Sequence, residues 1–258
     1  MYRKNYTCTI SQRNVPTLLF TVKASSTSST IDTPITPFWC RHHHLTKREK
    51  MASYKLEYYD CRGRGEVTRM LLALADKKYE DVRYSLEESH DELKKKLPCG
   101  QLPVFYVDGK QLVDSSAINS YLAREFGYYG SSSWEAALID QVVGVVGDLW
   151  TPLIETAFMP DEAAQLAKQK ELFDGKAQVF LKFLEDMLCK NKEGDGFFVG
   201  DKISLADLNF HTAMESLENL KYTDKNLDKY PKLAALRARI SADKGLSEYL
   251  AARPKCPF

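Results

Sequence analysis

A tyrosine, two glycines and two arginines lie close together where a strand pattern ends and a helix pattern begins. Tyr58 stands near the end of an alternating run, residues 54–59, which predicts a short strand. Gly63 and Gly65 then permit a tight turn, and Arg62 and Arg64 flank the predicted helix start. A phenol hydroxyl, a fixed positive charge and free helix amides together favour a bound anion, and a thiolate suits this set of groups.

The elements that must position these groups follow a regular order. Residues 79–84 read as a second strand, residues 88–96 as a charged helix, and the apolar runs 104–107 and 111–113 flank an Asp108-Gly109 hairpin turn. We expect Ser115 or Ser116 to cap the helix that comes next. The order β-α-β-α-β-β-α predicts a thioredoxin-like α/β domain over residues 51–127.

Helical signals dominate the second half of the chain, after a Gly- and Ser-rich linker. One long amphipathic helix is predicted over residues 172–187. Ser204 and Asp207 have the spacing of a capping box, and Pro231 is placed to open a further helix. The predicted fold is therefore a thioredoxin-like N-terminal domain followed by an all-α domain, residues 134–258.

Residues 1–50 differ from the rest in composition. They carry a net charge of +6 and are rich in Ser and Thr, so we expect a disordered extension. Two interpretations stay open, a mitochondrial transit peptide and translation that begins at Met51. The remaining residues carry a net charge of −5, in a whole chain of +1, and give no reason to expect nucleic-acid binding.

The cysteines and the apolar stretches bear on the compartment. Six cysteines stand at scattered spacings without a Cys-x-x-Cys motif, which favours reduced thiols. The apolar stretches are too short or too polar for a membrane span. We expect a cytoplasmic protein, or a mitochondrial one if residues 1–50 are a transit peptide.

A series of short motifs carries a family resemblance. The stretch from Tyr58 to Arg64 is followed at characteristic spacing by the runs 97–103 (LPCGQLP), 107–109 (VDG), 114–118 (DSSAI) and 204–207 (SLAD). In this order they resemble cytosolic glutathione transferases of the sigma class, over about four-fifths of the chain. The resemblance implies a homodimer whose co-substrate is glutathione.

The resemblance also implies roles for individual residues. Tyr58 would donate a hydrogen bond to the glutathione thiolate, and Arg64 would support it. Lowering a thiol pKa by about 2 from about 8.5 takes about 2.7 kcal/mol, which a phenol and a nearby cation can supply. The other implied glutathione contacts are His90, Lys94, Gln101, Leu102, a cis Pro103, Asp114, Ser115 and, from the partner subunit, Asp148.

Three features depart from the family pattern. Asp114 stands where relatives have a glutamine, and a carboxylate there would repel the glutathione carboxylate unless it turns toward the ammonium group. His90 replaces a tryptophan. Gly144 and Gly147 occupy positions where vertebrate prostaglandin-isomerising relatives place cation-binding aspartates, so we expect no metal.

The acceptor-substrate pocket implied by the family layout would be apolar and suited to hydrophobic electrophiles. Its expected residues are Cys61, Arg62, Trp150 and Ile154. Cys61 also offers an alternative, thiol-redox catalysis as in the omega-class relatives.

The expected function is conjugation of glutathione to hydrophobic electrophiles, as in detoxification. Peroxidase and prostaglandin isomerase activities at the same site stay open. A different class of function is non-enzymatic: lens S-crystallins resemble the same class and have lost most activity, and a carrier of hydrophobic ligands would need the pocket without the thiolate.

Overall fold

The computed structural model describes residues 52–86, 91–218, 220 and 226–256. The expected N-terminal extension and His90 lie outside the described residues. Residues 50–258 form one compact unit.

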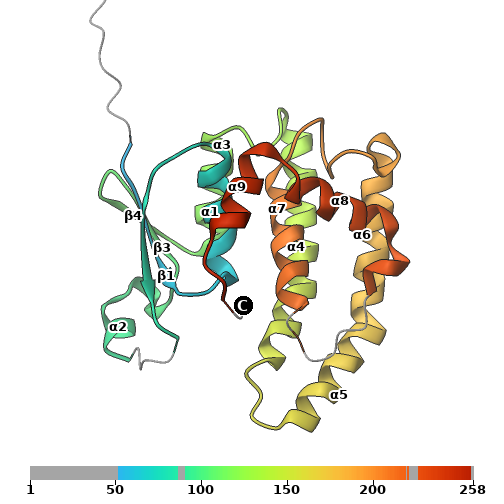
Figure 1. The fold of residues 1–258 in the computed structure, drawn as a ribbon, viewed down its shortest axis with the longest axis horizontal. Helices are drawn as coiled ribbons and strands as arrows, with labels where there is room; N and C mark the ends of the chain where they lie inside the picture. The colour runs from blue at the N-terminus through green and yellow to red at the C-terminus, as the bar shows by residue number, and fades with distance from the viewer. Residues whose placement is uncertain (1–51, 87–90, 219, 221–225, 257–258) are drawn as a thin grey trace, which may run out of the picture. The chain divides into compact units, whose positions relative to one another are not determined.

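The first half of this unit is a four-stranded mixed sheet with helices beside it (Figure 1). The strands lie in the order β2-β1-β3-β4, with β1 and β2 parallel and the other two pairs antiparallel. Its elements are β1 (Tyr54–Tyr59), α1 (Glu66–Leu74), β2 (Glu80–Tyr84), α2 (Asp91–Lys96), β3 (Val104–Val107), β4 (Lys110–Val113) and α3 (Ser115–Glu125). The predicted thioredoxin-like domain is confirmed.

The turn between β3 and β4 is the predicted hairpin. Asp108 and Gly109 both have positive φ, 50° and 77°, as a tight two-residue connection between twisted strands requires. The start of α3 differs from the prediction. Its cap is Asp114, whose carboxylate accepts a hydrogen bond from the Ala117 amide at 3.0 Å. Because the helix already begins at Ser115, both Ser115 and Ser116 lie inside its first turn and neither is the cap.

In the second half, all the regular elements formed by the described residues are helices. Its helices are α4 (Ser133–Thr156), α5 (Glu162–Leu172), α6 (Gln178–Lys190), α7 (Leu205–Leu217), α8 (Pro231–Ser241) and α9 (Lys244–Ala252). The single helix predicted over residues 172–187 is instead the end of α5, a π-helical turn (Phe173–Ala177) and α6. The extra residue in that turn shifts the helical phase, so Val179 faces solvent and is 67% exposed.

Helix α7 runs through the middle of the molecule, against α1 and α4 (Figure 1). The predicted capping box opens it: Asp207 accepts hydrogen bonds from the Ser204 amide (2.8 Å), the Ser204 hydroxyl (2.7 Å) and the Phe198 amide (2.9 Å). Complete burial raises the pKa of the Asp207 carboxyl to about 6, although these hydrogen bonds oppose that rise. Because α1 packs against both α3 and α7, it joins the sheet domain to the helical domain.

Candidate functional site

Tyr58 lies buried near the end of β1, directly against the turn that leads into α1. Its hydroxyl oxygen accepts a hydrogen bond from the Arg64 backbone amide at 2.9 Å. Two glycines make this contact possible. A Cβ atom on Gly63 would lie 2.7 Å from the hydroxyl oxygen, and one on Gly65 would lie 2.6 Å from a ring carbon. Residues with a side chain at positions 63 and 65 would therefore clash with the Tyr58 ring.

The electrostatics of Tyr58 favour a hydrogen-bond donor rather than a base. Burial raises the pKa of its hydroxyl above the ordinary value for tyrosine, and the Arg64 amide and the charges of Arg64 and Arg69 only partly oppose this. The phenol therefore keeps its proton at neutral pH. With its oxygen already accepting from Arg64, its own proton is free to go to an anion placed beyond it.

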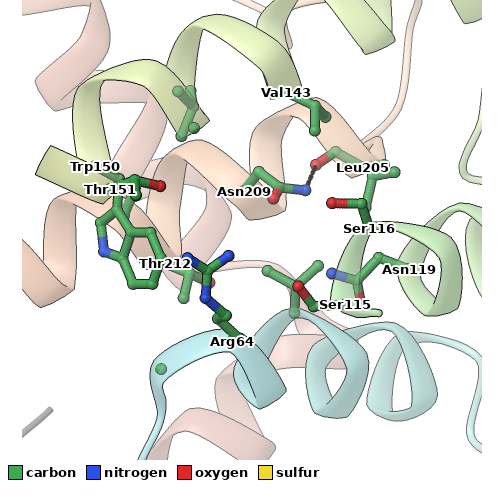
Figure 2. A pocket seen from close by; sticks show the side chains of 15 residues that line it. Arg64, Ser115, Ser116, Asn119, Val143, Trp150, Thr151, Leu205, Asn209 and Thr212 are labelled. Atoms are coloured by element: carbon green, nitrogen blue, oxygen red, sulfur yellow. Dashed lines mark hydrogen bonds between the residues drawn. The ribbon is translucent and has the colours of Figure 1, made fainter. Parts of the chain in front are cut away.

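A cavity of about 110 Å³ lies between the sheet domain and helices α4 and α7 (Figure 2). The Arg64 guanidinium lies over the Trp150 ring in its wall, 5.1 Å from the ring centroid. Gly63 and Arg64, of the turn that packs against Tyr58, line the cavity, whereas Tyr58 itself does not. The full lining is Gly63, Arg64, Val67, Ser115, Ser116, Asn119, Val143, Val146, Gly147, Trp150, Thr151, Leu205, Asn209, Thr212 and Ala213.

One end of the cavity meets the N-terminus of α3. Ser115 and Ser116 line it there, beside the amides of a helix start, a position that favours a carboxylate. Asn119 is buried next to them and its Oδ1 accepts from the Thr68 hydroxyl at 2.7 Å. Its amide nitrogen is thereby directed toward the cavity (Figure 2). The carboxylate of Asp114 is occupied by the helix cap.

The other predicted glutathione contacts lie outside that wall. The Leu102-Pro103 peptide bond is cis, as predicted, and Pro103 is buried just before β3. Lys94 and Gln101 are exposed, and Asp148 is exposed on α4. Arg64 and Ser115 thus line one cavity. The other predicted contacts lie along the edge of the sheet domain (Lys94, Gln101 and Pro103) and on α4 (Asp148).

Of the four residues predicted for the acceptor pocket, Trp150 lines the cavity and the other three do not. Ile154 lies one turn further along α4. Cys61 is buried, and its burial raises the pKa of its thiol to about 11, so it is protonated at neutral pH and poorly suited to redox catalysis. Arg62 is held elsewhere, by groups near the C-terminal end.

A network of charged groups, which we call the C-terminal clamp, holds Arg62. Its guanidinium donates to the Cys256 carbonyl at 3.1 Å and pairs with Glu215 at 3.3 Å. Arg253 bridges Glu215 and the buried Glu66 of α1. The clamp consists of Arg62, Glu66, Glu215, Tyr249, Arg253 and the Cys256 carbonyl. It ties the turn below Tyr58 to α7, to α9 and to the segment after α9.

Sequence reasoning missed the polar part of the cavity wall. Asn209 and Thr212 belong to α7, Thr151 to α4 and Asn119 to α3. The available signal was a pair of uncharged polar residues three positions apart in a largely apolar helix segment, residues 205–214. That spacing places both side chains on one helix face.

The fold and site define a class of protein: a thioredoxin-like domain joined to an all-helical domain, with a phenol and an arginine beside a cavity between them. The chain belongs to the glutathione S-transferase family. Residues 54–124 match the family's N-terminal domain and residues 147–253 its C-terminal domain.

Individual relatives agree with this assignment. S-crystallin SL11 of Nototodarus sloanii is 35% identical over 209 residues, which are 81% of this chain and all of that one. A Nu-class GST from Haemonchus contortus is similar in structure, with a TM-score of 0.70 and 34% identity over 81% of this chain and all of that one. A sigma-class GST of Fasciola hepatica gives 0.73 and 31%, over 80% and 99%.

Proposed function

We propose that this protein conjugates glutathione to small electrophiles. The observation that carries the proposal is the buried Tyr58, which stays protonated while the Arg64 amide occupies its oxygen. A thiolate placed beside the phenol would accept its proton as a hydrogen bond. Such a charge-assisted bond is worth about 1.5–3 kcal/mol, which lowers a thiol pKa by about 1–2.

In the proposed reaction the glutathione sulfur attacks an electrophilic carbon of the acceptor. A carbon–sulfur bond forms, and either a leaving group departs or a π bond of the acceptor opens. Tyr58 keeps its proton throughout and stabilises the sulfur only while it is anionic. Arg64 adds a positive charge at the same turn and, through its contact with Trp150, one wall of the acceptor cavity.

We assign the glutathione molecule itself to the sheet domain. Ser115 and the start of α3 would bind its γ-glutamyl carboxylate. The Leu102 backbone, before the cis Pro103, would pair with the cysteinyl part, and Lys94 and Gln101 would reach the glycyl end. Because the Asp114 carboxylate faces the α3 amides, its repulsion of a bound carboxylate is reduced.

We further propose a homodimer of the sigma type, paired through α4. This helix has 24 residues and a mean hydropathy of 1.4 in its most apolar window, of which 28% is buried. It is long and apolar enough to cross a membrane, but a second copy of the chain is a better occupant of its open face. Gly144 is exposed on this face and has no neighbouring atom within 4 Å of a Cβ position, which leaves room for a close backbone approach. Asp148 on the same helix would then reach the partner's glutathione.

We propose a cytoplasmic, detoxifying role. None of the described cysteines, Cys61, Cys99, Cys189 and Cys256, forms a disulfide bond, which agrees with a reducing compartment. Detoxification follows from the chemistry proposed, since a thioether adduct removes the electrophilic centre.

The test is conjugation of glutathione to chlorodinitrobenzene by the full chain, beside its retention on immobilised glutathione. We expect both for the parent protein. Tyr58→Phe should retain glutathione binding and lose about tenfold or more of kcat, because one charge-assisted hydrogen bond is removed. Undiminished turnover by this variant would refute the role of Tyr58.

A non-enzymatic role, as a crystallin-like or ligand-carrying protein, is the second candidate, and the 35% identity to an S-crystallin favours it. It predicts retention on immobilised glutathione without turnover of any electrophile. The hydrogen bond from the Arg64 amide to Tyr58 and the position of Arg64 in the cavity wall support a thiolate site instead.

A further inference from the structure

The C-terminal clamp is part of a ring of ion pairs and hydrogen bonds that closes on the turn after β1, residues 60–65. Three arginines and two glutamates alternate around this ring: Arg62, Glu215, Arg253, Glu66 and Arg69. Arg69 of α1 closes the ring, because its guanidinium donates to the Cys61 carbonyl at 2.7 Å. The turn is therefore held at two neighbouring residues, Cys61 from the side of α1 and Arg62 from the side of the helical domain.

Arg69 fixes the beginning of the turn from within the sheet domain. This arginine is fully buried, and it donates to the Tyr59 carbonyl at 3.4 Å and pairs with Asp81 at 3.2 Å. Its guanidinium also lies 5.8 Å from the centroid of the Tyr58 ring. These contacts set the end of β1 and the ring of Tyr58, but they stop at Cys61 and do not reach the Arg64 amide.

Arg62 fixes the next residue of the turn from the helical side. Its guanidinium donates to the Cys256 carbonyl at 3.1 Å and pairs with Glu215 of α7 at 3.3 Å. The side chains of this ion pair are only 16% and 17% exposed, so water screens their attraction less than it screens a surface pair. Arg62 is therefore a fixed point two residues before the Arg64 amide.

The position of this turn decides how the phenol of Tyr58 can be used. The Arg64 amide donates to the phenol oxygen at 2.9 Å, and while it does so the phenol proton is available to a thiolate. N–H···O hydrogen bonds rarely exceed about 3.2 Å, so a displacement of the turn by about 1 Å would break this one. The phenol would then be free to rotate its proton away from the sulfur.

We propose that Arg62 is a positioning residue for the Tyr58 phenol and acts through the backbone of the turn. Its contacts with Glu215 and with the Cys256 carbonyl keep the Arg64 amide on the phenol oxygen, so that the phenol donates its proton to the bound thiolate. Arg62 does not line the cavity, and its guanidinium is occupied by the two clamp groups. This inference rests on the proposed conjugating activity.

The first experiment measures the pKa of the glutathione thiol bound to the full chain, with no acceptor present. The readout is the ultraviolet absorbance of the thiolate as the pH is raised. Arg62→Met has a similar length and removes both contacts. We expect the pKa of the bound thiol to rise by about 0.5–1, because part of the charge-assisted hydrogen bond from the phenol is lost.

The same change should give a characteristic pH profile of conjugation. At saturating glutathione, kcat/KM for chlorodinitrobenzene should fall about three- to tenfold in Arg62→Met at pH values below the pKa of the bound thiol. At higher pH the variant should approach the parent, because the thiol is then ionised in both proteins. A loss of folded protein or of acceptor binding would instead lower the rate at every pH.

Glu215→Gln separates positioning from a direct effect of charge. Removing a negative charge would by Coulomb interaction alone lower the pKa of the bound thiol, whereas a weaker hold on Arg62 raises it. We expect a rise of about 0.3 or more. Because both substitutions break the same contact, the double variant should shift the pKa no further than Arg62→Met alone.

A matched control is Arg237→Met. Arg237 pairs with Glu218 at the end of α7, and its side chain is 19% exposed, close to the 16% of Arg62. This pair is not part of the clamp, so the variant should keep the thiol pKa of the parent within about 0.2. If Arg62→Met does not fold, Arg62→Lys, which keeps the charge and loses one of the two contacts, takes its place with an expected rise of about 0.3 or more.

The outcomes separate the inference from the function on which it rests. If the parent conjugates glutathione and either clamp variant fails to raise the pKa of the bound thiol by more than about 0.2, the inference alone is overturned. A rate that falls equally at every pH also overturns it alone. Absence of both conjugation and a thiolate signal in the parent overturns the proposed function and the inference together.

Discussion

The stability of this protein at acid pH should depend on His211 in a way that a single substitution can expose. His211 lies in α7, is 4% exposed, and its Nδ1 has no hydrogen-bond partner in the described part of the chain. Burial, together with the nearby positive charges of Arg237 and Arg253, lowers the pKa of its imidazole from 6.5 to about 4, although Glu215 and Glu218 oppose the change. The native protein therefore holds a neutral imidazole where an unfolded chain would hold a charged one.

The sign follows from proton binding. Between pH 6.5 and pH 4 the unfolded chain binds a proton at this residue that the native state does not, so stability falls as the pH falls. At about 1.4 kcal/mol for each pH unit, the loss from His211 alone approaches about 3 kcal/mol. His211→Leu removes the titrating group at similar volume. The free energy of unfolding of the variant, relative to that of the parent, should therefore rise by about 3 kcal/mol as the pH is lowered from 7 to about 4.5.

The assay is urea unfolding of parent and variant at four or five pH values across this range. The quantity compared is the difference between their free energies of unfolding, because every other titrating group cancels in it. Asp207, one turn earlier, has a raised pKa of about 6 and opposes His211 in the parent, so the parent's own profile is flatter than either residue alone would make it. A difference that stays constant within about 0.5 kcal/mol over the whole range would refute the reasoning.

Three further predictions follow from the contacts. Glu215→Gln should cost about 1–3 kcal/mol in urea unfolding, because it weakens two partly buried ion pairs, whereas Lys182→Met in an exposed pair should cost less than about 0.5. Gly63→Ala, at φ 39° and in contact with the Tyr58 phenol, should lower kcat about tenfold or more; Gly109→Ala, at φ 77° in open space, should lower stability and leave kcat unchanged. Asp207→Ala should destabilise by about 3 kcal/mol in the same urea assay, since it leaves three buried donors unpaired; a loss below about 1 kcal/mol would contradict that accounting.

Local features of this fold could be predicted from the sequence because their causes lie within a few residues. The first strand, which carries Tyr58 near its end, the Asp108-Gly109 hairpin and the capping box at Ser204 each depend on turn chemistry or on short-range periodicity, and each is confirmed. The cap of α3 was misplaced by one residue. Asp114 adopts a positive φ of 72°, a conformation that its neighbours in the sequence do not signal.

The composition of the cavity wall could not be predicted in the same way. Thr151 and Asn209 are fifty-eight positions apart, and they meet because α4 and α7 pack along each other. The partners of Arg62 also come from distant parts of the sequence. The family layout assigned it to the acceptor pocket, but α7 and the segment after α9 supply a carboxylate and a carbonyl that hold it outside the cavity wall.

The C-terminal clamp has a consequence for the order in which this enzyme assembles. The sheet domain that carries Tyr58 leaves the ribosome before the helical domain, yet Arg62, in the turn beneath that residue, gains its partners from residues 215 and 256. The bond from Arg62 to the Cys256 carbonyl spans 194 positions of sequence. A nascent chain can therefore form its sheet early, while the turn beside Tyr58 gains the Arg62 contacts only after residue 256 has been translated.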